Sequence, residues 1–340
     1  MNLLEVKNIC KTYGSGETTV KALKDVSFSV PKGEYVAIVG ESGSGKSTLL
    51  NMIGALDTPT SGKVLIDGKD IFSMNDKKLT VFRRRNIGFI FQAFNLVPEL
   101  TVEQNIIFPV LLDYQKPDKK YLEELLTVLN LKERRNHLPS QLSGGQQQRT
   151  ALARILAYEP EILLLDEPFS AMDTYLREKL RLELAEALKD YDGVSILVTH
   201  DRDEAYQLCP EILLMDQGKV LARGKTRDIF AWPQTCKAAR LTGCKNISRI
   251  RRMGERHICA LDWGGLELMA DRLVGEEITA VGIRAHDFEP LSRQKAAAYA
   301  YENCIPVEEP QVSEMPFEWY ITLKNGLWWK REKTIHTHNS

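Results

Sequence analysis

The feature that most constrains the fold is an eight-residue stretch, residues 40–47, which matches the pattern G-x-x-x-x-G-K-[ST] without a gap. An apolar run, residues 36–39, precedes it, and a helix-like run from residue 48 to residue 56 follows it. In such a loop, small residues allow successive backbone N–H groups to wrap closely around phosphates. The N-terminus of the following helix adds a partial positive charge. The stretch therefore predicts a strand, a phosphate-binding loop and a helix, in that order.

Two side chains at the end of this loop carry specific expectations. Lys46 is expected to reach the β- and γ-phosphates of a nucleoside triphosphate, and Ser47 to offer its hydroxyl to Mg²⁺. A chance glycine-rich turn is the alternative, and the flanking strand and helix argue against it. The residues predicted to bind the nucleotide here are Gly40, Glu41, Ser42, Gly43, Ser44, Gly45, Lys46, Ser47 and Thr48.

A second apolar run, residues 162–165, ends in the two carboxylates Asp166 and Glu167. Ligands of α/β sheets bind at the carboxyl ends of the strands, so Asp166 is placed to hold Mg²⁺ directly or through water. Glu167 is placed to polarise an attacking water as a general base. The alternative, an acidic strand end at the surface, carries less weight beside a phosphate-binding loop.

A second phosphate-binding turn is predicted about a hundred residues after the first. Ser143, Gly144, Gly145 and Gln146 open a helix whose later apolar residues share one face. A hydroxyl, exposed amides and a helix dipole together make an anion site. Taken alone, this turn would be a weak signal.

The organisation of the chain indicates two domains. Before residue 232, short apolar runs alternate with helical stripes, which predicts an α/β fold with a largely parallel sheet. All five tryptophans lie at or after residue 232, and Asn325-Gly326 between two β-rich runs predicts a hairpin. We therefore expect a nucleotide-binding domain over residues 1–232 and a small, mostly β, barrel-like domain over residues 233–340.

Composition excludes several classes of protein. Lys and Arg number 45 and Asp and Glu 46, which argues against binding nucleic acid through bulk charge. Six cysteines without C-x-x-C spacing indicate neither a disulfide scaffold nor a zinc site. No stretch approaches the roughly 18 apolar residues of a membrane span, and an export signal is not expected. A role at a membrane would therefore require another chain to hold this one there.

Together, these motifs resemble those of the nucleotide-binding subunits of ABC transporters, over residues 1 to about 232. The resemblance implies a P-loop ATPase domain with a helical subdomain, using ATP and Mg²⁺. It implies that Tyr13 stacks on adenine, that Gln92 senses Mg²⁺ and the permease, and that His200 contacts the γ-phosphate. Residues 142–146 resemble the family signature, and residues 170–173 resemble the loop that joins two subunits.

The resemblance also implies partners. Two subunits would form a head-to-tail homodimer, in which ATP on Lys46 of one subunit is closed over by Ser143, Gly144 and Gly145 of the other. Transmembrane permease subunits would hold the dimer at the cytoplasmic face of the cell membrane, together with an extracytoplasmic substrate-binding protein. No nucleic-acid partner is expected.

The two parts of the chain resemble different members of the family. Residues 1 to about 148 resemble ATPases of exporter, lipoprotein and peptide systems, on motifs that include residues 83–92 and 94–98. From about residue 149 the chain resembles molybdate-import ATPases, on motifs that include residues 202–206, 240–248 and 281–288. Natural recombination and an artificial join both remain as hypotheses.

Molybdate import is the first hypothesis for function, because an accessory domain is more substrate-specific than an ATP site. The alternative is an exporter-type ATPase for lipoproteins, peptides or antimicrobial resistance. A soluble ATPase switch is the alternative from another class, although such proteins usually carry two ATPase modules or long coiled-coil arms. In an oxyanion-sensing second domain, Ser248, Arg284 and His286 could donate hydrogen bonds to the anion, although ordinary surface positions would look the same.

Overall fold

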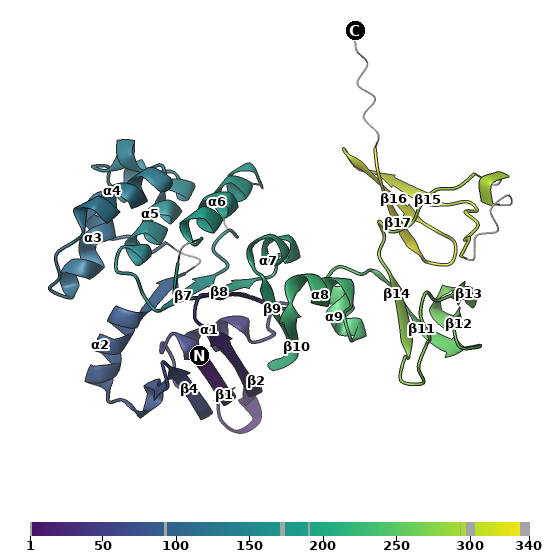
Figure 1. Cartoon of the computed structure of the whole chain (residues 1–340), viewed down its shortest axis with the longest axis horizontal. Helices are drawn as coiled ribbons and strands as arrows, with labels where there is room; N and C mark the ends of the chain where they lie inside the picture. Colours follow the sequence, from purple (N-terminus) through teal and green to yellow (C-terminus); the bar gives the residue numbers. More distant parts are fainter. Residues whose placement is uncertain are drawn as a thin grey trace, which may run out of the picture. The chain divides into compact units, whose positions relative to one another are not determined.

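The computed structural model describes residues 2–91, 94–170, 174–189, 191–292, 294–296 and 303–333. The chain divides into two compact units, Met1–Ala231 and Trp232–Ser340. The sequence analysis predicts a boundary near residue 232. Each unit has its own sheets and its own hydrophobic core (Figure 1).

The centre of the first unit is a six-stranded sheet with the order β10-β9-β3-β8-β7-β6. Its strands β3, β6, β7, β8 and β9 run parallel, and β10 closes one edge antiparallel to β9. Continuous apolar runs suit strands that are covered on both faces, which is why these interiors are almost fully buried. The predicted α/β fold with a largely parallel sheet is confirmed. The strands are β3 (Tyr35–Val39), β6 (Ile87–Ile90), β7 (Ile162–Asp166), β8 (Val194–Thr199), β9 (Glu211–Asp216) and β10 (Lys219–Lys225).

A second, antiparallel sheet lies beside the first and has the order β2-β1-β4-β5. Its strand β2 alternates between buried and exposed residues, with Val26, Phe28 and Val30 turned toward the core. Apolar residues of both sheets and of helix α1 (Lys46–Ile53) form one continuous core, so α1 is packed between the sheets. The strands are β1 (Asn2–Tyr13), β2 (Val20–Pro31), β4 (Ser61–Ile66) and β5 (Lys69–Asp70).

The remaining helices of the first unit include a helical subdomain, in which α3 packs against α5 and α4 lies beside them (Figure 1). An apolar stripe of leucines at helical spacing, Leu122, Leu125, Leu126 and Leu129, is buried there. No described helix is long and apolar enough to cross a membrane. The helices are α2 (Asp76–Asn86), α3 (Val102–Leu112), α4 (Lys119–Val128), α5 (Gly144–Leu156), α6 (Thr174–Ala187), α7 (Arg202–Leu208) and α8 (Thr226–Ala231).

The second unit is rich in β structure, as expected, and its strands form two antiparallel sheets. The predicted Asn325-Gly326 turn joins β16 to β17, and Gly326 has the positive φ of 82° that such a turn requires. Trp263, Leu323 and Leu327 belong to the buried core of this unit. The elements are α9 (Cys236–Leu241), β11 (Asn246–Arg252), β12 (His257–Ala260), β13 (Leu266–Met269), β14 (Ala280–Ile283), β15 (Gln311–Glu314), β16 (Glu318–Thr322) and β17 (Trp328–Glu332).

Candidate nucleotide-binding site

The loop of residues 40–47 joins β3 to α1, in the order that the sequence predicts. Two of its glycines are required by close contacts. A Cβ atom on Gly40 would lie 2.4 Å from the Met215 carbonyl oxygen, and one on Gly45 would lie 2.7 Å from that of Ala22. Gly45 also has a φ of 101° as the N-cap of α1. The loop is therefore pressed against β9 and β2, which fixes its shape.

The Lys46 side chain is folded back into its own loop. Its ammonium donates hydrogen bonds to the carbonyl oxygens of Gly40 at 2.8 Å and Glu41 at 3.0 Å, and the residue is 6% exposed. Burial lowers the pKa of Lys46, while the nearby carboxylates of Glu167 and Asp166 oppose that shift. The loop therefore holds a partly desolvated cation against its backbone.

Ser47 and Asp166, two of the three residues predicted to bind Mg²⁺, are brought together by α1 and β7. The third, Gln92, lies outside the described residues. The Ser47 hydroxyl donates to Asp166 Oδ1 at 3.3 Å. Burial raises the pKa of Asp166, and the hydrogen bond from Ser47 partly offsets that effect. A hydroxyl and a half-buried carboxylate are oxygen ligands of the kind Mg²⁺ prefers, so these residues fit the ion. The described residues contain no cluster of three or more His, Cys, Asp or Glu side chains for a metal.

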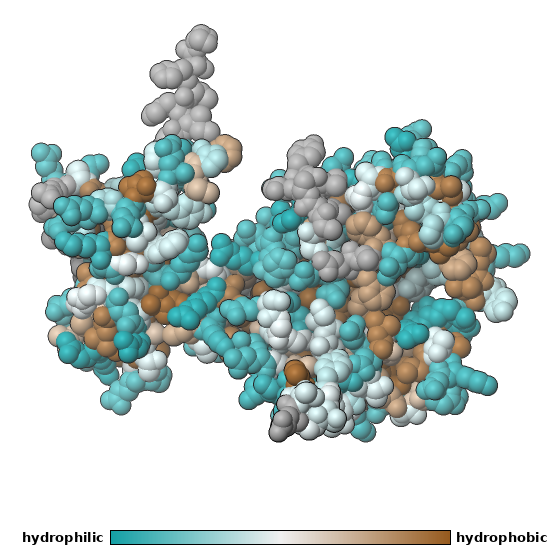
Figure 2. Space-filling model, turned by 180° about the vertical axis from the view of Figure 1, so that it is seen from behind, coloured by the Kyte–Doolittle hydropathy of each residue, from teal (hydrophilic) through white to brown (hydrophobic). Residues whose placement is uncertain are grey.

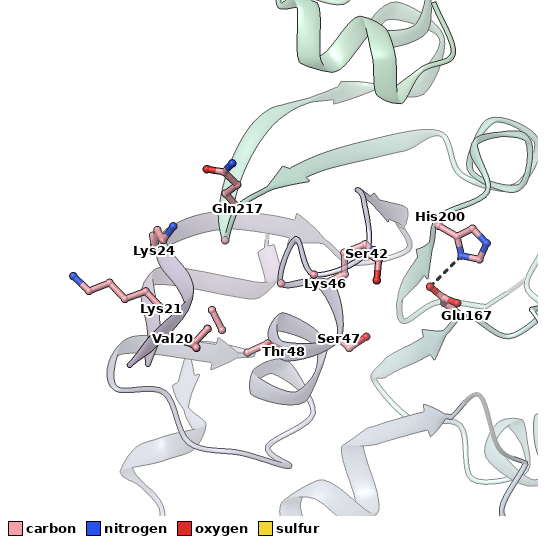
Figure 3. A pocket seen from close by; sticks show the side chains of 14 residues that line it. Val20, Lys21, Lys24, Ser42, Lys46, Ser47, Thr48, Glu167, His200 and Gln217 are labelled. Atoms are coloured by element: carbon pink, nitrogen blue, oxygen red, sulfur yellow. Dashed lines mark ion pairs between the residues drawn. The ribbon is translucent and has the colours of Figure 1, made fainter. Parts of the chain in front are cut away.

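Glu167 and His200 meet at the same edge of the sheet. The Glu167 carboxylate lies 3.1 Å from His200 Nδ1, and both line the cavity described below (Figure 3). Glu167 has a φ of 45°, a left-handed conformation that is unusual for a residue with a side chain. Its N–H donates to the Val198 carbonyl at 2.9 Å, which anchors the turn to β8. The carboxylate of Glu167 and the imidazole of His200, both predicted to be catalytic, are therefore adjacent.

A cavity of about 700 Å³ opens above the phosphate-binding loop (Figure 3). It brings the loop together with residues that the sequence analysis did not single out, from β2 and from the turn between β9 and β10. Gly218 of that turn donates its N–H to Ser44 O at 2.9 Å and accepts from Lys24 N at 2.8 Å. The lining comprises Val20, Lys21, Ala22, Lys24, Ser42, Gly43, Gly45, Lys46, Ser47, Thr48, Glu167, His200, Gln217 and Gly218.

The turn of residues 143–146, which the sequence predicts to bind phosphate, begins α5 and is built as a capping box. Ser143 Oγ accepts from Gln146 N at 3.4 Å, and Gln146 Oε1 accepts from Ser143 N at 2.9 Å. Ser143 and Gly144 are exposed, and Gly145 is buried. Among the described residues, the cavity lining includes none of this turn, so the structure does not bring the two phosphate turns together within one chain.

The other predicted site residues divide into three groups. Tyr13 is the last residue of β1. The described lining of the cavity includes Thr48 but does not include Tyr13. Gln92 and residues 171–173 lie outside the described residues. Ser170 is described, and its hydroxyl donates to Glu167 O at 2.9 Å.

In the second unit, two of the three suggested anion donors are engaged in internal hydrogen bonds. Ser248 is buried, and its hydroxyl donates to Arg249 O at 2.8 Å and accepts from Asp262 N at 2.9 Å. Arg284 donates to Thr242 O at 2.7 Å. His286 is exposed, with Nε2 lying 3.4 Å from Asp287. These contacts give Ser248 and Arg284 a structural role.

A glycine-rich loop between a parallel strand and a helix, with a strand-end carboxylate beside it, defines a P-loop nucleotide hydrolase. The family model described as ABC transporter matches residues 23–170. The sulfate/thiosulfate import ATP-binding protein of Synechocystis is 37% identical over 297 residues, which is 87% of this chain and 79% of that protein. The chain belongs to the ATP-binding proteins of ABC transporters, which are ATPases that use ATP and Mg²⁺ to drive transport.

Other relatives match mainly over the first unit. An uncharacterized ABC transporter ATP-binding protein of Methanocaldococcus jannaschii is 44% identical over 232 residues, covering 66% of this chain and 98% of that protein. A solved dimer of an ATP-binding cassette bound to ADP and phosphate is 41% identical, with a TM-score of 0.60. It covers 66% of this chain and 99% of that chain.

The length of the alignment with the Synechocystis protein bears on the hypothesis that the two parts of the chain were joined from different members of the family. The first unit has 231 residues, so an alignment over 297 residues extends well into the second unit. One relative therefore matches both sides of the suggested junction near residue 148. The comparisons give no support to a junction there.

Proposed function

We propose that the chain is the ATP-hydrolysing subunit of an importer for a tetrahedral oxyanion, with molybdate as the first candidate and sulfate as the second. The observation that carries this proposal is the length of the alignment with the Synechocystis protein. The alignment continues beyond the first unit into the second. That relative is named for sulfate and thiosulfate import, and sulfate has the same tetrahedral shape and charge as molybdate. The molybdate assignment rests on the resemblance of residues 149 onward.

The proposed chemistry begins with binding of the triphosphate in the cavity above the loop. Backbone N–H groups of residues 40–47 and the N-terminus of α1 would surround the phosphates. The Lys46 ammonium, which now contacts loop carbonyls, would exchange these for the β- and γ-phosphates. Ser47 and Asp166 would hold Mg²⁺, which neutralises charge on the phosphate oxygens when bound.

Hydrolysis would depend on the adjacent Glu167 and His200. A carboxylate beside the phosphate-binding loop can accept the proton of an attacking water, the role proposed for Glu167. His200 lies within hydrogen-bonding distance of that carboxylate and would orient it and contact the γ-phosphate. The left-handed turn at Glu167 holds the side chain over the cavity rather than along the strand.

The turn of residues 143–146, in which Ser143 and Gly144 are exposed, supports the proposed head-to-tail homodimer. The N-terminus of a helix attracts an anion. Among the described residues, the lining of this chain's cavity includes none of residues 143–146. In the dimer, Ser143 and Gly144 would face the γ-phosphate bound to the other subunit, so each complete site would contain residues of both.

The helical subdomain is the proposed docking surface for the permease. Phe108, Leu111 and Leu112 near the end of α3 are 36 to 49% exposed. Figure 2 shows hydrophobic patches on the face of the first unit. Docking there would hold the subunit at the cytoplasmic face of the membrane without a membrane span of its own.

Reconstitution in vesicles tests the substrate class. The chain is combined either with a molybdate permease and its binding protein or with a sulfate permease and its binding protein, and ATPase stimulation by each anion is measured. We expect stimulation of at least about fivefold by molybdate with the first permease. Stimulation by sulfate alone would replace molybdate by the second candidate.

An exporter remains the second candidate function, because residues 83–92 and 94–98 resemble the corresponding motifs of exporter-type ATPases. A lipoprotein or peptide exporter permease therefore forms a third arm of the same experiment. Stimulation in this arm alone would overturn the importer proposal.

A further inference from the structure

The Tyr13 side chain is fixed at two points. Its hydroxyl donates a hydrogen bond of 2.8 Å to Asp57 Oδ2. The Lys11 ammonium lies 4.8 Å from the centroid of the Tyr13 ring and donates to Asp57 Oδ1 at 2.7 Å. Lys11, Tyr13 and Asp57 therefore form a closed cluster, in which the cation covers one face of the ring.

The cluster is built from parts of the chain that are distant in sequence. Lys11 and Tyr13 are two residues apart on β1, so their side chains point to the same face of the strand. Asp57 lies in the connection between α1 and β4, 44 residues after Tyr13. Lys11 also donates to Thr58 O at 2.7 Å, which ties this connection to the end of β1.

Charge within the cluster favours a rigid arrangement. Partial burial raises the pKa of Asp57, but hydrogen bonds from Lys11 and Tyr13 more than offset this, so the net shift is downward. Burial and the neighbouring Asp57 both raise the pKa of the Tyr13 hydroxyl, which keeps it a neutral donor. A charged acceptor bonded to two donors makes stronger hydrogen bonds than a neutral one.

We propose that Lys11 and Asp57 are positioning residues that present the uncovered face of the Tyr13 ring to the adenine of ATP. This inference rests on the proposed nucleotide site. Thr48, which lines the cavity, lies close enough to the Tyr13 hydroxyl to lower its pKa slightly, so the anchored ring lies beside the cavity. The ring is exposed and available for stacking, while Lys11 is largely buried beneath it.

The proposal separates base binding from phosphate binding. Stacking on an aromatic ring tolerates different bases, so loss of the anchor weakens ATP and GTP alike. Inorganic tripolyphosphate has no base and occupies the loop of residues 40–47 alone. Its affinity is independent of Lys11 and Asp57.

The test uses the full chain with Asp57→Asn, Lys11→Met and Tyr13→Phe. For Asp57→Asn we expect the KM for ATP to rise about fivefold, with kcat unchanged and competition by tripolyphosphate unchanged. Tyr13→Phe keeps the ring and removes its hydroxyl, and it gives a smaller rise than Tyr13→Ala. Asp67→Asn, an exposed aspartate after β4 that pairs with Lys69, is the matched control and leaves the KM unchanged.

A double-mutant cycle distinguishes positioning from general stabilisation of the fold. In a Tyr13→Ala background, Asp57→Asn causes no further loss of ATP affinity if it acts through the ring. An equal loss in both backgrounds, or an unchanged KM in Asp57→Asn, overturns the inference. Lys46→Ala separates this from the proposed function: if it leaves ATP and tripolyphosphate binding intact, the nucleotide site itself is wrongly placed.

Discussion

At the scale of single residues, the carboxylate that we propose as the general base belongs to a residue in a disfavoured backbone conformation. Glu167 has a φ of 45°, and such a conformation costs of order 1 kcal/mol for a residue with a Cβ atom. The hydrogen bond from its N–H to Val198 O and the contact with His200 keep the turn in place. The strain is consistent with a residue selected for where its side chain points rather than for stability.

Replacement of this carboxylate by its amide separates binding from hydrolysis. Glu167→Gln keeps the shape of the side chain and removes the proton acceptor, so we expect ATP binding to persist and turnover to fall by about 100-fold or more. Unhydrolysed ATP then accumulates between two subunits, and light scattering in MgATP detects a stable dimer. A variant that remains monomeric in ATP would contradict the assignment of Glu167.

Lys46→Ala is the complementary change. Removing the ammonium takes away the cation that we propose to contact the β- and γ-phosphates, so we expect ATPase activity to be lost and binding of MgATP to weaken. Normal turnover in a phosphate-release assay would refute the role of Lys46. Lys69→Ala, which removes an exposed lysine that pairs with Asp67 and does not line the cavity, serves as a control for the removal of a positive charge.

At the scale of elements, buried polar contacts join the end of β8 to the start of α7. They link Thr199, which precedes His200, to residues that follow it. Thr199 Oγ1 donates to Glu204 Oε2 at 2.6 Å and accepts from Asp201 N at 2.9 Å. Glu204 is 4% exposed. Burial raises the pKa of Glu204, while the Thr199 hydroxyl partly lowers it. The element pair therefore contains a carboxyl group that is more easily protonated in the folded state.

That raised pKa has a definite sign in the pH dependence of stability. The folded state holds the Glu204 proton more tightly than the unfolded state does. As the pH rises from about the ordinary glutamate pKa through the raised folded pKa, the contribution of Glu204 to the free energy of unfolding therefore falls. Glu204→Gln lacks this term. We expect its stability relative to the unmodified protein to increase from pH 4.5 to pH 7, in urea unfolding followed by circular dichroism. Parallel pH profiles for the two proteins would contradict the prediction.

The parts of this architecture that are predictable from sequence are those encoded locally. The phosphate-binding loop, the carboxylates after β7 and the Asn325-Gly326 hairpin each lie within one short segment, because backbone geometry there demands particular residues. The pairing of β1 with β2 and β4 depends on contacts far apart in the chain. For that reason the β2 side of the cavity and the Tyr13–Asp57 bond were not foreseen. The sequence also suggests Ser248 as an anion donor. It does not show that the Ser248 hydroxyl is hydrogen-bonded to the backbone of Arg249 and Asp262.

At the scale of the whole molecule, the chain consists of two units with separate cores. The archaeal relative matches over 98% of its own length while covering 66% of this chain, so a protein of about the first unit's size exists without a second unit. The cavity and both turns that the sequence predicts to bind phosphate belong to the first unit. Binding and hydrolysis of ATP are therefore assigned to that unit.

Truncation after Ala231 tests this division. We expect residues 1–231 to fold cooperatively and to bind MgATP within about threefold of the full chain's affinity, because their core is complete without the second unit. Calorimetry measures the binding, and circular dichroism measures the unfolding. An insoluble or non-cooperative fragment would mean that the first unit depends on the second.

The distribution of tryptophan gives the two units different optical properties. All five tryptophans belong to the second unit, and the unit that holds the nucleotide cavity has none. Trp328 is 42% exposed, with the Lys245 ammonium 4.8 Å from its ring. Intrinsic tryptophan emission is thus an unlabelled reporter of the second unit alone. A change in emission on addition of ATP would measure communication between the units directly, and a change on addition of an oxyanion would report on the second unit itself.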